Sequence, residues 1–306
     1  MDRAQTLHLR LARDAQRRLR PSFPDDPVPR DEAELRALEA TFVEEERAAV
    51  AAQAARAPAD PEGFVAWFES LRQIGPGQGD PLFPFLADEA TLEQMRWVLR
   101  QEVAGEAGFD DLIALTQLRM PVRAKLELAR NYWDEMGRGR ASAMHGPLLA
   151  DLARAIGAEA VLEETVWESL ALANLLVALA FDRRYAYHSV GALGAVELTA
   201  PTRVGYVDHG LARLGVSKSA RRYFSLHATL DVQHSASWNR EVLAPLVAHD
   251  ARCAHAIAEG ALMRLRAGAR CFTRYRAELG LAASARGTAA QRSGAPARRS
   301  DPPQPP

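Results

Sequence analysis

Cysteine is almost absent from this chain of 306 residues, which contains only Cys253 and Cys271. Both fall in a segment that reads as one helix, where residues this far apart are separated by about 27 Å. A disulfide requires Cα atoms within about 7 Å of each other, so these two cysteines cannot pair. The chain also lacks a basic N-terminal segment followed by an apolar stretch. We therefore expect a reducing, cytoplasmic compartment.

Long apolar runs and an excess of one charge are lacking as well. The best candidate for a membrane span, LALANLLVALAF, has only twelve residues. A span needs about 18 residues, so we expect a buried core helix there. The 38 basic and 39 acidic residues leave a net charge of −1, which gives no overall field to attract nucleic acid or an anionic membrane. The sequence therefore predicts a small-molecule substrate or a protein partner, and neither nucleic acid nor membrane.

Strand-like alternation is scarce, whereas helical spacing or strong helix formers occur nearly everywhere. The hydrophobic content of 48% is enough to bury a large core. Pro201 is expected to end a helix, because proline lacks the backbone N–H that a helix interior needs. These features predict an all-α fold. The expected helices cover residues 2–19, 31–57, 62–73, 89–105, 119–136, 147–157, 160–181, 186–198, 202–214, 219–236 and 239–279.

A proline-rich segment at residues 20–29 and a segment rich in glycine and proline at residues 75–84 interrupt the helical pattern. They delimit an N-terminal helical extension, residues 1–80, from a main helical domain, residues 81–282. The extension could cover the main domain or form the surface of a homodimer, and the sequence does not decide between these two roles. Residues 283–306 lack apolar periodicity and are expected to form a disordered tail.

The segment SLHATLDVQHSASW places His227, Asp231 and His234 on one stripe of a helix. At about 100° per residue, steps of four and three return a side chain to within roughly 40° of its starting direction. Two imidazoles and one carboxylate are a ligand set that suits iron or manganese. A hydrogen-bonded core network or an exposed polar face would explain the same stripe, so the pattern needs further ligands to indicate a metal site.

Further ligand-type residues lie upstream of this stripe. Glu135 ends an amphipathic helix, Gly137 and Gly139 follow, and His145 precedes the next helix. On an unbroken helix Glu135 and His145 would point about 80° apart, so the glycines are needed to permit a bend that brings them together. Glu197 lies in the apolar segment GALGAVELTAP, where a carboxylate is costly unless it is paired or bound to a metal.

Three patterns occur in a fixed order: DE-x-G-x-G-x5-H from Asp134 to His145, the glutamate of GALGAVELTAP, and H-x3-D-x2-H. In this order they resemble the haem-oxygenase-like diiron oxidases and oxygenases, also described as iron-containing redox enzymes. The similarity covers residues 90–250. It implies a haem-oxygenase-like helical bundle that holds two irons and no haem.

The resemblance also implies the metal ligands and their chemistry. Three carboxylates would largely offset the charge of two Fe(II) ions, and three imidazoles would keep the ions able to cycle between Fe(II) and Fe(III) with O2 as co-substrate. Glu197 would be the bridging carboxylate. Manganese accepts the same ligands, so the metal stays open between the two. The six implied ligands are Glu135, His145, Glu197, His227, Asp231 and His234.

Some relatives use one more carboxylate from the preceding helix. Glu106, Asp110 and Asp111 are the candidates here. A plain helix-capping role explains the two aspartates equally well.

The expected function is that of an O2-dependent oxidase or oxygenase acting on a small organic substrate in a biosynthetic pathway. Relatives imply amine N-oxygenation or oxidative C–C cleavage, and whether a partner protein donates electrons stays open. Arg183, Arg184 and Arg203 could hold a substrate carboxylate or could simply be surface charges. A different class is a metal-free helical binding protein that retains the bundle. A thiamine-degrading or haem-handling relative is disfavoured, because it would not need six ligand-type residues in this order.

Overall fold

Helices make up the architecture, and the all-α prediction is confirmed. No strand occurs in residues 2–105 and 108–281, which are the residues that the computed structural model describes; for residues 228–232 it describes the backbone only. The predicted tail and Glu106 lie outside the described residues. The α-helices are α1 (Arg3–Leu19), α2 (Glu32–Ala54), α3 (Pro61–Ile74), α4 (Leu82–Asp88), α5 (Leu92–Gly105), α6 (Phe109–Thr116), α7 (Val122–Glu135), α8 (His145–Ile156), α9 (Trp167–Phe181), α10 (Ala186–Arg213), α11 (Arg222–Trp238), α12 (Ala244–His249) and α13 (Arg252–Glu278).

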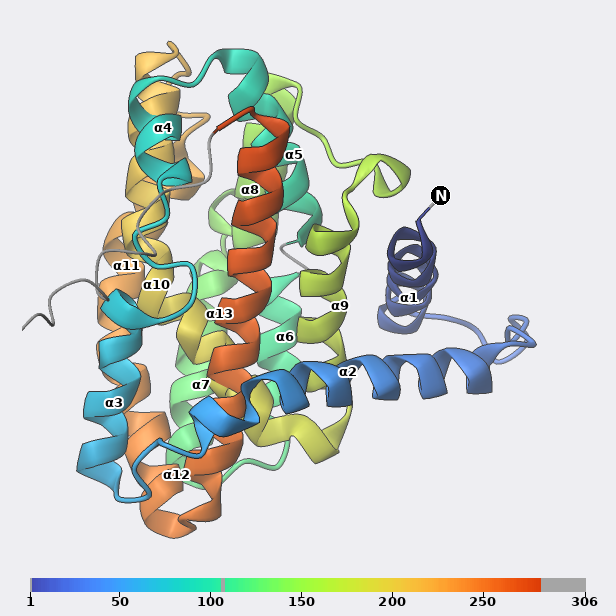
Figure 1. Ribbon diagram of the computed structural model, residues 1–306, viewed down its shortest axis with the longest axis vertical. Coiled ribbons are helices and arrows are strands. Elements are labelled where there is room, and N and C mark those ends of the chain that lie inside the picture. Colours follow the sequence, from blue (N-terminus) through green and yellow to red (C-terminus); the bar gives the residue numbers. More distant parts are fainter. Residues whose placement is uncertain (1, 106–107, 282–306) are drawn as a thin grey trace, which may run out of the picture.

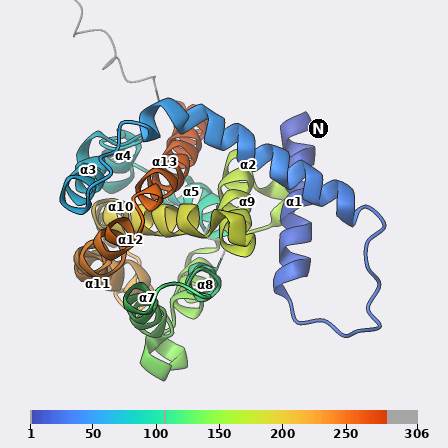
Figure 2. The ribbon, with the colours of Figure 1, turned by 90° about the horizontal axis from the view of Figure 1, so that it is seen from below.

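Helix α10 runs through the centre of the bundle and packs against α13, α11, α4 and α9 (Figures 1 and 2). Two glycines permit its crossing with α13. A Cβ atom on Gly191 would lie 1.9 Å from the carbonyl oxygen of Ile257, and one on Gly260 would lie 1.9 Å from the carbonyl oxygen of His188. Because neither glycine has a side chain, the two backbones approach closely and fix the helix that carries Glu197.

Helices α1 and α2 cover the face formed by α9 and α13, as Figure 2 shows. Charged pairs hold α2 in place: Arg266 and Arg270 of α13 donate to the two carboxylate oxygens of Glu46, at 2.8 and 2.6 Å. Glu46 is buried, so these bonds satisfy a carboxylate that would otherwise be costly there. The division into an extension and a main domain stays a prediction.

The prediction of one helix over residues 239–279 is wrong, because this segment forms three separate helical elements. A π-helical turn, Asn239–Leu243, is followed by α12, and Asp250 then takes an extended conformation before α13 begins. Asp250 accepts hydrogen bonds from the backbone N–H of Arg252, at 2.9 Å, and from its side chain, at 2.5 Å for the nearest, which satisfies a backbone donor at the start of α13.

Pro201 does not end a helix as predicted, since α10 continues from Ala186 to Arg213. Proline removes one backbone hydrogen bond, to the carbonyl of Glu197, and packing against α13, α11 and α4 supports the helix on either side. Helices α4 and α6 were not predicted. In α4 the side chains of Leu82 and Leu86 are fully buried, so burial overrides the glycine and proline signals just before it.

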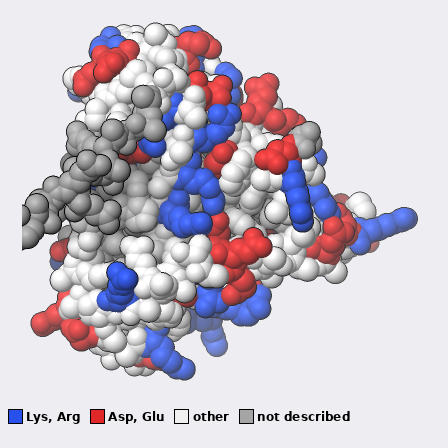
Figure 3. All heavy atoms as spheres, in the orientation of Figure 1, with Lys and Arg blue, Asp and Glu red and all other residues white. Residues whose placement is uncertain are grey.

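The distribution of surface charge and the state of the two cysteines agree with what the composition led us to expect. Acidic and basic side chains are interspersed over the face shown in Figure 3. Within the described part of the chain, none of the helices is both long and apolar enough to cross a membrane. Residues 170–181 form most of α9, which is almost entirely buried as predicted. Cys253 and Cys271 both lie in α13, buried and unpaired.

Candidate metal centre

Glu135 is the last residue of α7 and His145 is the first of α8, and the connection between them, residues 136–144, contains two short 3-10 helices and turns tightly at Gly137. The backbone between them is left-handed at Gly137 and Gly139, with φ of 61° and 79°. A Cβ atom on Gly137 would lie 2.5 Å from the carbonyl carbon of Ala143. The bend predicted from the glycines is therefore present, and it brings His145 Nδ1 to 2.7 Å from Glu135 Oε2.

Helix α11 presents His227 and His234 to the same region. The Nδ1–H of His227 donates to the carbonyl oxygen of Tyr223 at 2.6 Å. A carbonyl oxygen only accepts, so this bond places the lone pair on Nε2. That nitrogen faces the centre, at 2.9 Å from His145 Nδ1 and 3.7 Å from Glu135 Oε2. One oxygen and two ring nitrogens thus converge as a first group of ligand atoms.

A second group forms around His234. Its Nδ1 lies 3.8 Å from Glu135 Oε1 and 3.5 Å from Glu197 Oε2. The amide of Asn131 donates to the other oxygen of Glu197 at 2.7 Å. On the opposite side of the ring, His234 Nε2 lies 3.3 Å from Asp134 Oδ2. Glu135 therefore belongs to both groups, one oxygen to each, whereas Glu197 belongs to the second group alone. The bridging role that the resemblance implied for Glu197 stays a prediction.

The protonation of the site without metal follows from these contacts. Burial opposes the ionisation of Glu135, but the neighbouring imidazoles of His145 and His227 outweigh it and lower the pKa of this carboxyl. Burial by itself would lower the pKa of His234, yet Glu197, Glu135 and Asp134 raise it to about 10. His234 consequently carries a proton where a metal ion would otherwise offset the two carboxylates.

The donor set fits iron. Within each group the three ligand atoms lie within 4.8 Å of one another, and all five residues are buried. Adjacent ligand atoms of an octahedral ion with bonds of about 2.1 Å lie about 3 Å apart. The distances of 2.7, 2.9 and 3.7 Å in the first group are close to that spacing. Imidazole and carboxylate together are the ligands of non-haem iron sites that leave open positions.

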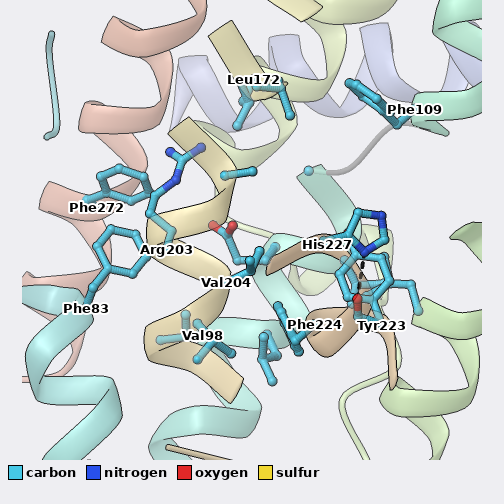
Figure 4. A pocket seen from close by; sticks show the side chains of 18 of the residues that line it. Phe83, Val98, Phe109, Leu172, Arg203, Val204, Tyr223, Phe224, His227 and Phe272 are labelled. Atoms are coloured by element: carbon cyan, nitrogen blue, oxygen red, sulfur yellow. Dashed lines mark hydrogen bonds between the residues drawn. The ribbon is translucent and has the colours of Figure 1, made fainter. Parts of the chain in front are cut away.

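A cavity of about 160 Å³ adjoins the first group and extends between α5, α9, α10, α11 and α13. Glu135, His145, Glu197 and His227 contribute to its wall at one end. Figure 4 shows Tyr223 and His227 on one side of this cavity and Arg203 and Phe272 on the other. Much of the remaining wall is apolar. It includes Leu82, Phe83, Leu86, Val98, Leu99, Val103, Leu172, Leu176, Val196, Val204 and Val207.

The model of the family described as "Iron-containing redox enzyme" matches residues 96–269, which contain both groups of ligand atoms. The chain belongs to this family. The predicted resemblance is thereby confirmed. A solved structure with the same fold is that of a CADD-like protein of unknown function from Nostoc punctiforme, with a TM-score of 0.50 and 18% sequence identity. The similarity extends over 78% of this chain and 97% of the Nostoc punctiforme chain. No curated protein matches the chain.

In this iron-containing redox enzyme the fold brings together five of the six expected ligand residues. These are Glu135, His145, Glu197, His227 and His234. Asp231 lies on α11 between the two histidines, but its side chain lies outside the described residues. Asp110 and Asp111 occupy the first turn of α6, where Asp111 is exposed. Neither is among the described residues that line the cavity, and acidic groups in a first turn favour the helix.

Three neighbours of the ligands were not recognised in the sequence. Asn131 holds Glu197, Asp134 contacts His234, and the Tyr223 hydroxyl lies 3.2 Å from His145 Nε2. Helical spacing carried a signal for two of them, because Asn131 precedes Glu135 by four residues and Tyr223 precedes His227 by four. Asp134 also contacts Arg138, at 2.6 Å.

Proposed function

We propose that this iron-containing redox enzyme is a non-haem diiron, O2-dependent oxidase or oxygenase that acts on a small organic substrate in a biosynthetic pathway. Amine N-oxygenation or oxidative C–C cleavage is the reaction proposed. The observation that carries the proposal is the position of Glu135, whose two oxygens face two separate groups of buried ligand atoms. A single-ion site would need only one such group.

The residues around the two groups have distinct tasks. Glu135 would hold both ions, His145 and His227 the first, and Glu197 and His234 the second. Two irons bound there supply the capacity to activate O2 and to withdraw electrons from a substrate. Asn131 keeps the carboxylate of Glu197 turned toward His234, since its amide donates to the other oxygen. The apolar wall of the cavity excludes water from the space beside the ligands.

The partners belong to the proposal too. With a net charge of −1 and mixed surface charges, we propose a small-molecule substrate, and no nucleic acid or membrane partner. An electron-donor protein and a homodimer remain part of the hypothesis. Two unpaired cysteines in one helix favour a reducing, cytoplasmic compartment.

Anaerobic titration of the metal-free chain with Fe(II) tests the proposal, with iron counted per chain and Mössbauer spectra recorded. We expect about two irons in the wild type, about one in His227→Ala and in His234→Ala, and fewer than one in Glu135→Ala. The two sites differ in ligands, so the wild-type spectrum should contain two components, and each histidine variant should lose a different one. O2 consumption should then require both irons.

His209→Ala is the matched control, because His209 is exposed and distant from the ligand groups. It should bind as much iron as the wild type. No stoichiometric binding in the wild type would instead support a metal-free helical binding protein. Binding of only one iron by the wild type, with that iron lost in all three ligand variants, would refute the two-site arrangement.

A further inference from the structure

Two arginines form the end of the cavity that lies away from the ligand groups. Arg203 extends from α10 and Arg264 from α13, and both residues line the cavity. Figure 4 shows Arg203 across the cavity from His227, with its guanidinium beside Phe272. Two cations facing one small, mostly apolar cavity need an explanation, because a charge without a partner is costly in such surroundings.

The described chain leaves most of their hydrogen-bond donors unused. Arg203 donates to Thr199 Oγ1 at 2.9 Å, and its guanidinium carbon lies 5.6 Å from the centre of the Phe272 ring. For Arg264, Nε and Nη1 are buried and have no hydrogen-bond partner among the described residues. No ion pair to either arginine occurs in that part of the chain. A guanidinium offers five donors, so the pair retains the capacity to bind an anion.

The charges at this end do not balance. Burial lowers the pKa of both guanidinium groups, and for Arg203 the charge of Arg264 adds to this effect and brings the pKa to about 9. Both stay protonated at neutral pH. Glu102 is the carboxylate that favours their charged forms, and it also interacts with the Tyr275 hydroxyl. One carboxylate against two guanidinium groups leaves an excess of one positive charge.

We propose that Arg203 and Arg264 bind the carboxylate of the substrate, and that the substrate is an amphipathic monoanion whose apolar part extends along the cavity toward Glu135 and His227. This assignment rests on the proposed function for its chemistry. An excess of one charge favours a carboxylate over a phosphate dianion, and the guanidinium fork matches two carboxylate oxygens. Glu135 and Glu197 at the opposite end repel a carboxylate, so the charges also orient the molecule.

The other candidate arginines are already occupied. Arg183 donates to the carbonyl oxygen of Leu115 at 3.0 Å, at the end of α6. Arg184 is exposed and pairs with Asp182 at 2.7 Å. Of the three arginines that the sequence suggested for a substrate carboxylate, only Arg203 lines the cavity, and Arg264 was not recognised as its neighbour.

Calorimetric binding of hexanoate, octanoate and decanoate to the full chain tests the proposal, with and without Fe(II). Octanol and octyl phosphate are the comparison ligands. We expect at least one of the carboxylates to bind. Octanol should bind about tenfold or more weakly than octanoate, and octyl phosphate should bind no more tightly than octanoate. Arg203→Met and Arg264→Met should each raise the octanoate Kd about tenfold or more, whereas Arg240→Met, at an exposed site, should leave it unchanged.

The thermal stability of the Arg264→Met variant distinguishes a role of Arg264 in substrate binding from a role in holding the fold. If Arg264 serves binding, replacing an unpartnered buried cation by methionine should leave the Tm of the ligand-free chain equal or higher. A lower Tm with unchanged octanoate affinity would overturn the proposal, as would equal affinity for octanol or tighter binding of octyl phosphate. Iron stoichiometry is measured separately, so a chain that binds two irons but no carboxylate fails this proposal alone, and one that binds carboxylate but no iron fails only the proposed function.

Discussion

Asp134 Oδ2 lies 3.3 Å from His234 Nε2, on the side of the imidazole opposite to Glu135 and Glu197. A carboxylate at this place fixes the orientation of the ring and makes its other nitrogen a better metal ligand. Arg138 in turn holds Asp134, since its Nε donates to Oδ1 at 2.6 Å. The adjacent residues Asp134 and Glu135 therefore act on the same histidine from opposite sides.

Replacing Asp134 by alanine should weaken binding at the second of the two proposed iron sites, the one around His234. Because His234 loses the partner of its Nε2 atom, we expect the Fe(II) affinity of that site to fall by about ten- to a hundredfold, with the first site unchanged. Titration with Fe(II), in which each Mössbauer component is followed separately, measures this change in affinity. Asp151→Ala is the control, because Asp151 forms a similar pair with Arg154 on the exposed side of α8. Equal affinity in Asp134→Ala and the wild type would show that Asp134 is only a surface partner of Arg138.

Much of this centre could be predicted because its residues lie on regular helices. The spacing of His227 and His234 fixes their common stripe, and two glycines made the bend between Glu135 and His145 foreseeable. The sharing of Glu135 between two groups could not be predicted, since it depends on how α7, α10 and α11 pack against one another. Arg264 was missed for the same reason, because its proximity to Arg203 arises only from the crossing of α10 and α13.

The turn between α7 and α8 depends on Gly137. In Gly137→Ala the new Cβ would meet the carbonyl carbon of Ala143 at 2.5 Å, in a backbone with φ of 61° that alanine disfavours. We expect the free energy of unfolding to fall by at least about 2 kcal/mol and His145 to leave the first iron site. Urea unfolding and iron counting measure the two effects.

Gly157→Ala separates backbone strain from the steric clash. Gly157 has a φ of 70°, but nothing lies within 4 Å of its added Cβ. Only the conformational cost should remain, about 1 kcal/mol, with both irons retained. If the two variants were equally stable and bound equal amounts of iron, the tight turn would not be what positions His145.

The crossing of α10 and α13 should tolerate no side chain. In Gly191→Ala the new Cβ would lie 1.9 Å from the carbonyl oxygen of Ile257, so the helices must separate and the cavity between them must change. We expect a loss of about 3 kcal/mol or more in the free energy of unfolding. Gly205→Ala on the same helix has nothing within 4 Å of its Cβ and should be stabilising by up to about 1 kcal/mol. A stable Gly191→Ala protein would contradict this close approach.

His8, which lies in α1, makes the free energy of unfolding depend on pH. Its ring is buried, with its centroid 4.8 Å from that of Phe42 and 5.8 Å from that of Trp167. Burial, with a smaller contribution from Arg270 and against the opposing effect of Glu46, lowers the pKa of His8 to about 4. In the unfolded chain the pKa of histidine is about 6.5. Between these values the unfolded state binds a proton that the folded state does not.

The free energy of unfolding should therefore fall as the pH decreases from about 6.5 to about 4, by up to about 3 kcal/mol from this residue. His8→Phe keeps an aromatic ring but removes the titrating group, so its stability should decline less over the same interval. Urea unfolding at a series of pH values measures the difference. Leu9→Ala is the control, because it weakens the packing of α1 without removing a titrating group, and it should lower stability equally at every pH. If His8→Phe followed the wild-type pH profile, the ring of His8 would be protonated in the folded chain, and α1 would be bound more loosely than its contacts with α9 indicate.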